Sequence, residues 1–255
     1  MKGLLLGVAL TFGLVQEVHS MVNPERVFSD PHVVALAGAV AKGDVETVRQ
    51  LLASGVDARA RGASGMTLPH FALYARANGP AVLKLLLHAG ADPISRLEDK
   101  NDVPHYAAAR DDADPAFLAV LLDAGVSPSL VGGDRENSLL NAAVSGRNEA
   151  VVKLLLARGA DVNYNHPFVG TALHTAVTIA DYRVAALLLN HGANPHLRDN
   201  QSPLVEKSIP RNTPAEIYCL YQSGHHRYAT PQQLAEFQEM KEAFARRGVI
   251  LPCGI

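Results

Sequence analysis

The chain has 255 residues, of which 48% are hydrophobic and only 5% aromatic, and it contains no tryptophan. A core that is poor in aromatic residues favours closely packed helices over a sheet sandwich. The 23 basic and 25 acidic residues leave a net charge of −2. No basic surplus is present to neutralise a phosphate backbone, so nucleic acid is excluded as an expected partner.

The first twenty residues differ from the rest of the chain. Lys2 is the only charge before residue 17, and residues 4–15 are almost wholly apolar. Such a run has the length of a signal-peptide core and is too short to span a bilayer. Because Ser20 ends a cleavage-site pattern, residues 1–20 are predicted to be a signal peptide and residues 21–32 a lead-in. Export would place a soluble mature chain in the periplasm; the alternatives are an uncleaved anchor and a buried helix.

A phrase of the form L-L-x-x-G recurs along the chain, for example LLASGVD at 51–57 and LLARGAD at 155–161. A second phrase lies in register before it, for example TALHTA at 171–176. Leucines three and four residues apart lie on one face of a helix. A following glycine can adopt the left-handed conformation that ends the helix. The glycines of the first phrase, spaced 35, 35, 34 and 33 residues apart, are Gly55, Gly90, Gly125, Gly159 and Gly192.

The two phrases resemble the L-L-x-x-G-A-D and T-P-L-H-x-A signatures of the ankyrin repeat. The resemblance covers residues 33–200. It implies an all-α fold, a solenoid of helix-turn-helix units with short projecting hairpins. One unit alone cannot bury its apolar face, so stacking of the units would supply a continuous core. Five repeats are predicted, at about 33–65, 66–100, 101–136, 137–169 and 170–200.

The predicted repeats depart from the family pattern in two ways. In the second and third repeats Pro directly precedes His70 and His105, and 20 residues separate each His from the next repeat glycine, against 18 in the later repeats. Two extra residues are therefore expected in the turn between the helices, near residues 76–80 and 111–115. In the first repeat Ala37 takes the His position, which suits an N-terminal cap with one solvent-facing side.

Residues 201–255 lose the repeat pattern and are predicted to be a divergent capping repeat with an inserted helix. Thr230 begins a capping box with Pro at the first helical position. A helix is therefore expected over residues 231–247, ended by Gly248. The side chains expected on its buried face are Met240, Ala243 and Phe244.

The two cysteines, Cys219 and Cys253, both fall in this C-terminal region. Export to an oxidising compartment would permit a disulfide between them. The alternative is one buried thiol and one exposed thiol, because spacing alone does not fix disulfide geometry.

No catalytic or cofactor-binding motif is present, neither a Gly-x-Ser-x-Gly nucleophile motif nor a P-loop. His70, His105 and His174 take the His position of the repeat, where the resemblance implies a structural role. A metal site at His225-His226 is the alternative, but adjacent side chains point apart and no Cys or carboxylate stands at ligand spacing. We therefore expect a binding module rather than an enzyme, with no cofactor and no metal.

The resemblance implies a protein partner held by the hairpin tips and the faces of the first helices. Tyr and Arg are the side chains that most often anchor interfaces. A tip with Tyr164, His166 and Phe168 is the most unusual, because its large side chains would be exposed; the alternative is packing between neighbouring hairpins. The partner-binding candidates are Arg59, Arg61, Phe71, Tyr74, Tyr106, Arg110, Arg135, Tyr164, His166 and Phe168.

An exported ankyrin domain of this size is similar to the periplasmic immunity proteins of type VI secretion phospholipase effectors. That resemblance implies a chain, monomeric when alone, that neutralises a toxin by covering its active site. The competing hypothesis is a periplasmic stress or enzyme-supporting factor, as for ankyrin proteins that assist a catalase. A purely structural scaffold and an enzyme are the remaining classes, since a fold does not exclude a grafted site.

Overall fold

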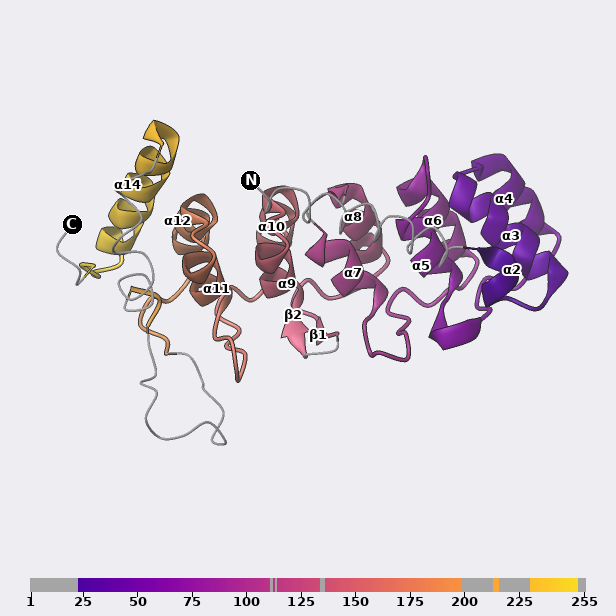
Figure 1. Cartoon of the computed structure of the whole chain (residues 1–255), viewed down its shortest axis with the longest axis horizontal. Helices are drawn as coiled ribbons and strands as arrows, with labels where there is room; N and C mark the ends of the chain where they lie inside the picture. Colours follow the sequence, from indigo (N-terminus) through magenta and orange to yellow (C-terminus); the bar gives the residue numbers. More distant parts are fainter. Residues whose placement is uncertain are drawn as a thin grey trace, which may run out of the picture. The chain divides into compact units, whose positions relative to one another are not determined.

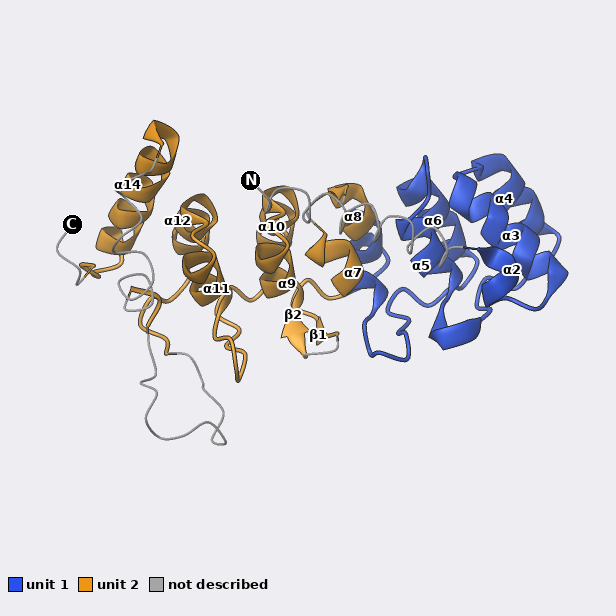
Figure 2. Cartoon of the chain, viewed as in Figure 1, with its two compact units in different colours: residues 1–104, 119–126 blue, residues 105–118, 127–255 orange. Residues whose placement is uncertain are grey.

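The computed structural model describes residues 23–110, 112, 114–133, 136–198, 213–215 and 230–251 (Figure 1). The predicted signal peptide, Arg135, His225-His226 and both cysteines lie outside these residues. The chain divides into two compact units, Met1–Pro104 with Ala119–Val126, and His105–Leu118 with Ser127–Ile255 (Figure 2). Within the described ranges, no helix is long and apolar enough to cross a bilayer.

The first unit consists of helix pairs, and we call the first helix of each pair the inner helix and the second the outer helix. The inner helix α3 (Pro31–Lys42) packs on the inner helix α5 (Leu68–Leu73), and the outer helix α4 (Val45–Ala53) packs on the outer helix α6 (Gly79–His88). Leu36, Leu68, Leu83 and Leu86 lie between them and are fully buried. The elements are α2 (Pro24–Val27), α3 (Pro31–Lys42), α4 (Val45–Ala53), η1 (Ala63–Gly65), α5 (Leu68–Leu73) and α6 (Gly79–His88).

In the second unit the inner helices α9 (Leu139–Ser145) and α11 (Ala172–Thr178) also pack on each other, and each packs on the outer helix of its own pair. A short antiparallel hairpin places Val131 opposite Ser138 and Gly132 opposite Asn137. The elements are β1 (Val131–Gly132), β2 (Asn137–Ser138), α9 (Leu139–Ser145), α10 (Glu149–Ala157), α11 (Ala172–Thr178), α12 (Tyr182–Asn190) and α14 (Pro231–Arg246); α7 (Val103–Ala109) and α8 (Pro115–Asp123) cross the boundary between the units.

The repeat glycines end the outer helices, as the sequence predicts. Gly159 follows α10 with φ 81°. Its N–H donates to the Leu156 carbonyl at 3.1 Å, and the Ala160 N–H donates to the Leu155 carbonyl at 3.0 Å. These two bonds satisfy carbonyls that the end of a helix leaves without partners. Only a residue without a β-carbon adopts this left-handed conformation at no steric cost.

Ser127 in the third repeat, and an acidic or amide residue in the other four, lies two positions after the repeat glycine and turns the chain into the next hairpin. Its side-chain oxygen accepts the N–H two residues further on, at 2.9 Å for Asp57 and 3.0 Å for Asp92. The same bond recurs at Asp161 and Asn194, at 2.9 and 3.0 Å. Asx turns of this kind fix a turn locally, so each hairpin leaves its outer helix in a direction set by three residues.

The repeat histidines are structural, in agreement with the resemblance. Nδ1 of His174 accepts the N–H of Thr171 at 3.1 Å, and the Thr171 hydroxyl caps α11. His105 Nε2 lies 2.9 Å from the carbonyl oxygen of Asn137, at the base of the β1–β2 hairpin. His70 lies 2.8 Å from the Thr67 hydroxyl, and burial lowers the pKa of His70 to about 4. All three histidines are buried.

The turns between paired helices have the predicted lengths. α5 ends at Leu73 and α6 begins at Gly79, whereas α9 ends at Ser145 and α10 begins at Glu149. The turn of the earlier pair is thus two residues longer. The same difference separates the α7–α8 turn from the α11–α12 turn. Asn78 in the longer turn takes φ 49°, and its side chain donates to the Gly43 carbonyl at 3.1 Å.

The C-terminal helix α14 begins with the predicted capping box and ends before Gly248, which takes φ 74°. The predicted inner face, Met240, Ala243 and Phe244, is buried. The helix packs on α12, and Arg247 donates to the Leu189 carbonyl at 3.1 and 2.9 Å. Its closing bond, from the Val249 N–H to the Phe244 carbonyl at 3.0 Å, matches those of the outer helices. α14 therefore packs and ends as an outer helix does.

Candidate partner-binding surface

Hairpins connect the repeats, and we number those within the described residues from the N-terminus. The first two, residues 57–67 and 92–102, belong to the first unit, and the next two, residues 127–138 and 161–171, belong to the second. Antiparallel bridges close three of them, Arg61 with Thr67, Arg96 with Asp102, and His166 with Gly170.

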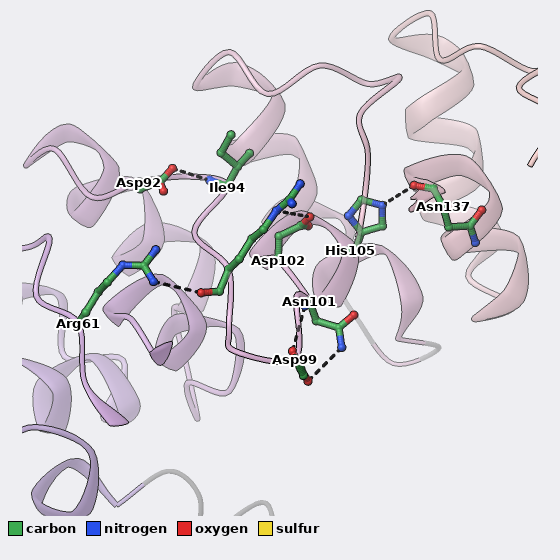
Figure 3. Close-up of polar contacts among 9 residues, drawn as sticks. Arg61, Asp92, Ile94, Asp99, Asn101, Asp102, His105 and Asn137 are labelled. Carbon is green, nitrogen blue, oxygen red and sulfur yellow. Dashed lines mark hydrogen bonds and ion pairs between the residues drawn. The ribbon is translucent and has the colours of Figure 1, made fainter. Parts of the chain in front are cut away.

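The first two hairpins are bound to each other. Nη1 of Arg61 donates to the Arg96 carbonyl at 3.2 Å (Figure 3). The Glu98 N–H also donates to the Ser64 carbonyl at 3.0 Å. Arg61 therefore helps to hold the hairpins together, although the sequence assigned it to partner binding alone. Arg59 is exposed and lies 3.4 Å from Asp57, an ion pair within its own turn.

The second hairpin contains a buried carboxylate that sequence reasoning missed. Asp102 takes the position of Thr in the T-P-L-H phrase, and its side chain is fully buried 3.9 Å from Nε of Arg96 (Figure 3). Asp99 accepts from the backbone and side-chain amides of Asn101 at 2.9 and 3.1 Å. The departure from Thr at position 102 was visible in the sequence, but its burial depends on the folded hairpin.

Phe71 is a core residue and not a binding residue. It is 1% exposed, and its ring lies 5.5 Å from the ring of Phe28, which is also buried. Phe28 follows α2, a short helix in the segment that the sequence treated only as a lead-in. The ring of Phe28 thus covers the inner-helix position that we expected to be open. Tyr74, at the end of the same helix, is half-buried.

Tyr106 on α7 and Arg110 just after this helix are both partly buried. The guanidinium of Arg110 donates to both carboxylate oxygens of Asp112 at 2.9 Å. These bonds hold the pKa of Asp112 below its usual value. The Arg110 carbonyl also accepts from the Asn148 side chain at 2.9 Å. The charge of Arg110 is therefore paired within its own turn, whereas the Tyr106 ring offers a half-buried surface.

The three candidates of the fourth hairpin, Tyr164, His166 and Phe168, lie in different environments, which the sequence did not distinguish. The Tyr164 hydroxyl donates to the Glu136 carbonyl at 3.1 Å, and burial, with a smaller contribution from the Glu136 charge, raises the pKa of Tyr164. His166 is 3% exposed, whereas Phe168 is 64% exposed. The alternative, packing against the hairpins, therefore holds for Tyr164, which bonds to the third hairpin, and for His166, which is buried in its own hairpin. Of the three side chains, only Phe168 exposes its ring to solvent. His166 therefore leaves the set of side chains that could touch a partner directly.

Potential metal ligands do not gather in the part of the chain that the structure describes: no group of three His, Cys, Asp or Glu side chains could hold an ion there. The surface offered by the hairpins is instead a mixture of charged and apolar side chains. Arg59 is exposed at the first, Val131 at the third, and Phe168 with Val169 at the fourth.

Comparison with known proteins agrees with this geometry. Residues 104–199 match the family model of ankyrin repeats, in three copies. A 55-residue segment is 46% identical to an ankyrin-repeat protein of Acanthamoeba polyphaga mimivirus, covering 22% of this chain and 34% of that one. A 66-residue segment is 44% identical to an ankyrin-repeat-containing protein of Treponema pallidum, covering 26% and 22%. The chain therefore spans about a third or less of the length of these relatives.

Two solved structures have a similar fold. The ankyrin-repeat domain of Bcl-3 aligns with a TM-score of 0.61 at 22% identity, over 82% of this chain and 80% of that one. A second ankyrin-repeat protein aligns with a TM-score of 0.62 at 22% identity, over 83% and 96%.

The helix pairs, glycine-ended outer helices and projecting hairpins define a helical-repeat protein. The chain has the ankyrin-repeat fold, and residues 104–199 match the family model of ankyrin repeats. Ankyrin repeats typically serve as protein–protein interaction modules.

Proposed function

We propose that this chain is a protein-binding module that works in the periplasm and holds its partner with its hairpin tips and the half-buried inner-helix residues Tyr74 and Tyr106. One observation carries the proposal: a recurring leucine is buried in the second, third and fourth repeats, whereas several side chains that differ between the hairpins are exposed. Leu86, Leu121 and Leu155 of the repeated phrase are fully buried. The hairpin residues Arg59 and Phe168 differ from one hairpin to the next and face solvent.

The character of the exposed side chains favours a protein partner. Stable protein interfaces combine buried aromatic or Arg anchors with a polar rim. The hairpins offer both kinds of side chain, and the net charge of −2 provides no basic surface of the kind that nucleic acid needs.

The finer proposal names the partner as a phospholipase effector of type VI secretion, which the chain would neutralise by covering its active site. The signal-peptide pattern of residues 1–20 and the ankyrin-repeat fold support it. The competing role, support of a periplasmic enzyme such as a catalase, predicts a different partner in the same experiment.

The experiment is a pull-down from periplasmic extract on the immobilised mature protein, followed by titration of the recovered partner. Arg59→Ala is compared with Lys84→Ala, which removes an exposed cation from the outer helix α6 instead. We expect the hairpin variant to bind more weakly and the outer-helix variant to bind normally. The reverse pattern would move the binding surface to the outer helices.

Two further measurements test the finer points. N-terminal sequencing of the fractionated protein is expected to find a chain that begins near Met21 in the periplasm, and an intact Met1 in the cytosol would refute export. A recovered phospholipase is expected to lose its activity at one equivalent of the chain. Recovery of a catalase in its place would favour the competing role.

A further inference from the structure

The tip of the fourth hairpin is a closed three-residue loop. The backbones of His166 and Gly170 exchange two hydrogen bonds, at 3.0 and 3.1 Å. Pro167, Phe168 and Val169 lie between them, and the last two are 64% and 44% exposed. Two adjacent large apolar side chains are thus presented to solvent on a narrow projection.

The His166 side chain fixes the conformation of this loop through its hydrogen bonds. Its Nδ1 accepts the N–H of Phe168 at 3.1 Å and the N–H of Val169 at 3.2 Å. Its ring lies 5.7 Å from the ring of Phe168 and is itself buried. Pro167 has a fixed φ, which removes further freedom from the loop. The loop is therefore ordered without any partner.

The base of the hairpin is tied to its neighbours on both sides. The Tyr164 hydroxyl donates to the Glu136 carbonyl of the third hairpin, and the Asn165 side chain donates to the Arg198 carbonyl at 2.9 Å. With both flanks held and the loop closed, the ring of Phe168 has a defined position relative to α11 and its neighbours.

We propose that Phe168 is the anchor of the partner interface and that His166 is a positioning residue that holds the anchor ready to bind. The partner is a protein with an uncharged apolar pocket that is deep enough for one aromatic ring. This inference rests on the proposed function, because it names the pocket that the binding module recognises.

The chemistry of the hairpin selects a protein pocket over other surfaces. Residues 162–180 contain no Lys, Arg, Asp or Glu; the neighbouring Arg198, whose carbonyl accepts from the Asn165 side chain, brings one cation beside them. Nucleic acids and anionic bilayers both need clusters of Lys or Arg side chains to bind. A projection of three residues reaches into a hollow but covers little of a flat surface. An aromatic side chain that fills a desolvated pocket is the usual source of large binding energies.

The order of the loop explains why this position suits an anchor. Binding loses affinity to the entropy of each side chain and loop that must be ordered. At this tip the ordering has already occurred during folding, through the two bonds to Nδ1 of His166. Without that acceptor, Phe168 would stay exposed, but the position of its ring would no longer be fixed.

The absence of tryptophan from the chain gives a direct test of the positioning role. Phe168→Trp introduces a single indole fluorophore, whose anisotropy reports the mobility of the tip in the protein alone. His166→Ala in this background removes the acceptor. His166→Asn keeps a side-chain oxygen that can accept the same N–H groups, as Asn194 does for the N–H of His196 at 3.0 Å.

We expect the anisotropy of the introduced indole to be high in the Phe168→Trp parent, to fall clearly with His166→Ala and to return with His166→Asn. Urea midpoints identify any variant that is unfolded. An unchanged anisotropy with His166→Ala would overturn the positioning role, as would a failure of the Asn variant to restore it. Because no partner is present, this result is independent of the proposed function.

The anchor itself is tested on the protein recovered in the pull-down. Phe168→Ala is expected to weaken binding at least thirtyfold. Val131→Ala, which trims an apolar side chain that is 37% exposed on the third hairpin, is expected to change it less than threefold. Equal, small effects of both would overturn the anchor and leave the binding module intact. Recovery of no protein would overturn the module and its pocket together, and the anisotropy would still decide the role of His166.

Vesicles of phosphatidylethanolamine and phosphatidylglycerol test the choice of a protein over a membrane. We expect the fluorescence emission of the Phe168→Trp variant to keep its wavelength when these vesicles are added. A shift to shorter wavelength would show that the ring enters the bilayer, and would overturn the protein pocket.

Discussion

Tyr182 and Phe237 lie edge to face with their ring centroids 5.6 Å apart, although 55 residues separate them in the sequence. Tyr182 begins α12 and Phe237 lies in the middle of α14. Arg246 and Arg247 join the other ends of the same two helices, through Asn190 and the Leu189 carbonyl. The last helix is thus fixed at two points along its length.

Removal of the Phe237 ring is therefore expected to loosen α14. Phe237→Ala deletes a buried aromatic side chain and should lower the free energy of unfolding by about 3 kcal/mol. Gln238→Ala, on the exposed side of the same helix, should change it by less than about 0.5 kcal/mol. Urea denaturation followed by circular dichroism measures both. Similar midpoints for the two variants would mean that α14 is not part of the cooperative unit.

Two glycines should respond to substitution in opposite directions. Gly159→Ala places a β-carbon at φ 81°, and since no atom lies within 4 Å of it, the cost is backbone strain of about 1 kcal/mol. Gly38→Ala adds a β-carbon in the interior of α3, also with open space around it, and should stabilise by about 0.5–1 kcal/mol. Thermal and urea unfolding of the pair give the sign directly. A loss of stability in both would contradict the backbone explanation.

The fourth repeat contains a position that can be improved. Asn141 takes the place of the repeat His and is buried, yet neither atom of its side-chain amide has a hydrogen-bond partner among the described residues. A buried polar group without a partner costs about 1–3 kcal/mol. Asn141→His can reach further, as His105 does to the Asn137 carbonyl. We expect it to raise the free energy of unfolding by about 1 kcal/mol. Asn141→Ala leaves a cavity and serves as the control, with a predicted loss.

His70 should make the stability of the protein depend on pH. Burial lowers its pKa in the folded state from 6.5 to about 4, so between these values the unfolded chain binds the proton more readily. This contribution to stability is present above pH 6.5 and is lost as the pH falls towards 4, by up to about 3 kcal/mol.

The measurement compares urea unfolding at about pH 7.5 and about pH 4.5, on either side of the unfolded-state pKa. His70→Gln should flatten the difference between the two pH values by a few kcal/mol. His88→Gln, an exposed histidine at the end of α6, should keep most of it. If both variants behave alike, the buried imidazole is not the source of the acid sensitivity.

The local features of the fold could be predicted because their causes lie within a few residues. Gly159 ends a helix with a conformation that its own backbone demands, and Thr171 and His174 cap a helix within one turn. The longer turn after α5 followed from a count of residues between two recurring phrases. Each of these three features can be predicted without knowing which residues pack against it in the core.

The candidate surface was less predictable because exposure depends on distant neighbours. Phe71 resembles an open inner-helix residue until Phe28, 43 residues earlier in the chain, covers it. His166 and Phe168 are two residues apart in the same loop, and no hydrophobic pattern distinguishes them. Their different fates depend on the closure of the loop, which turns one ring inward and the other outward.

The side-chain acceptors that turn the chain after each outer helix have an evolutionary consequence. Each lies two residues from the N–H that it binds, so the entry into a loop is encoded in a stretch of three residues and needs nothing from the loop itself. Mutations beyond that stretch can alter the residues shown to a partner without redirecting the chain. A lineage could therefore acquire a new recognition specificity by changing one loop at a time, while the inherited scaffold stays the same.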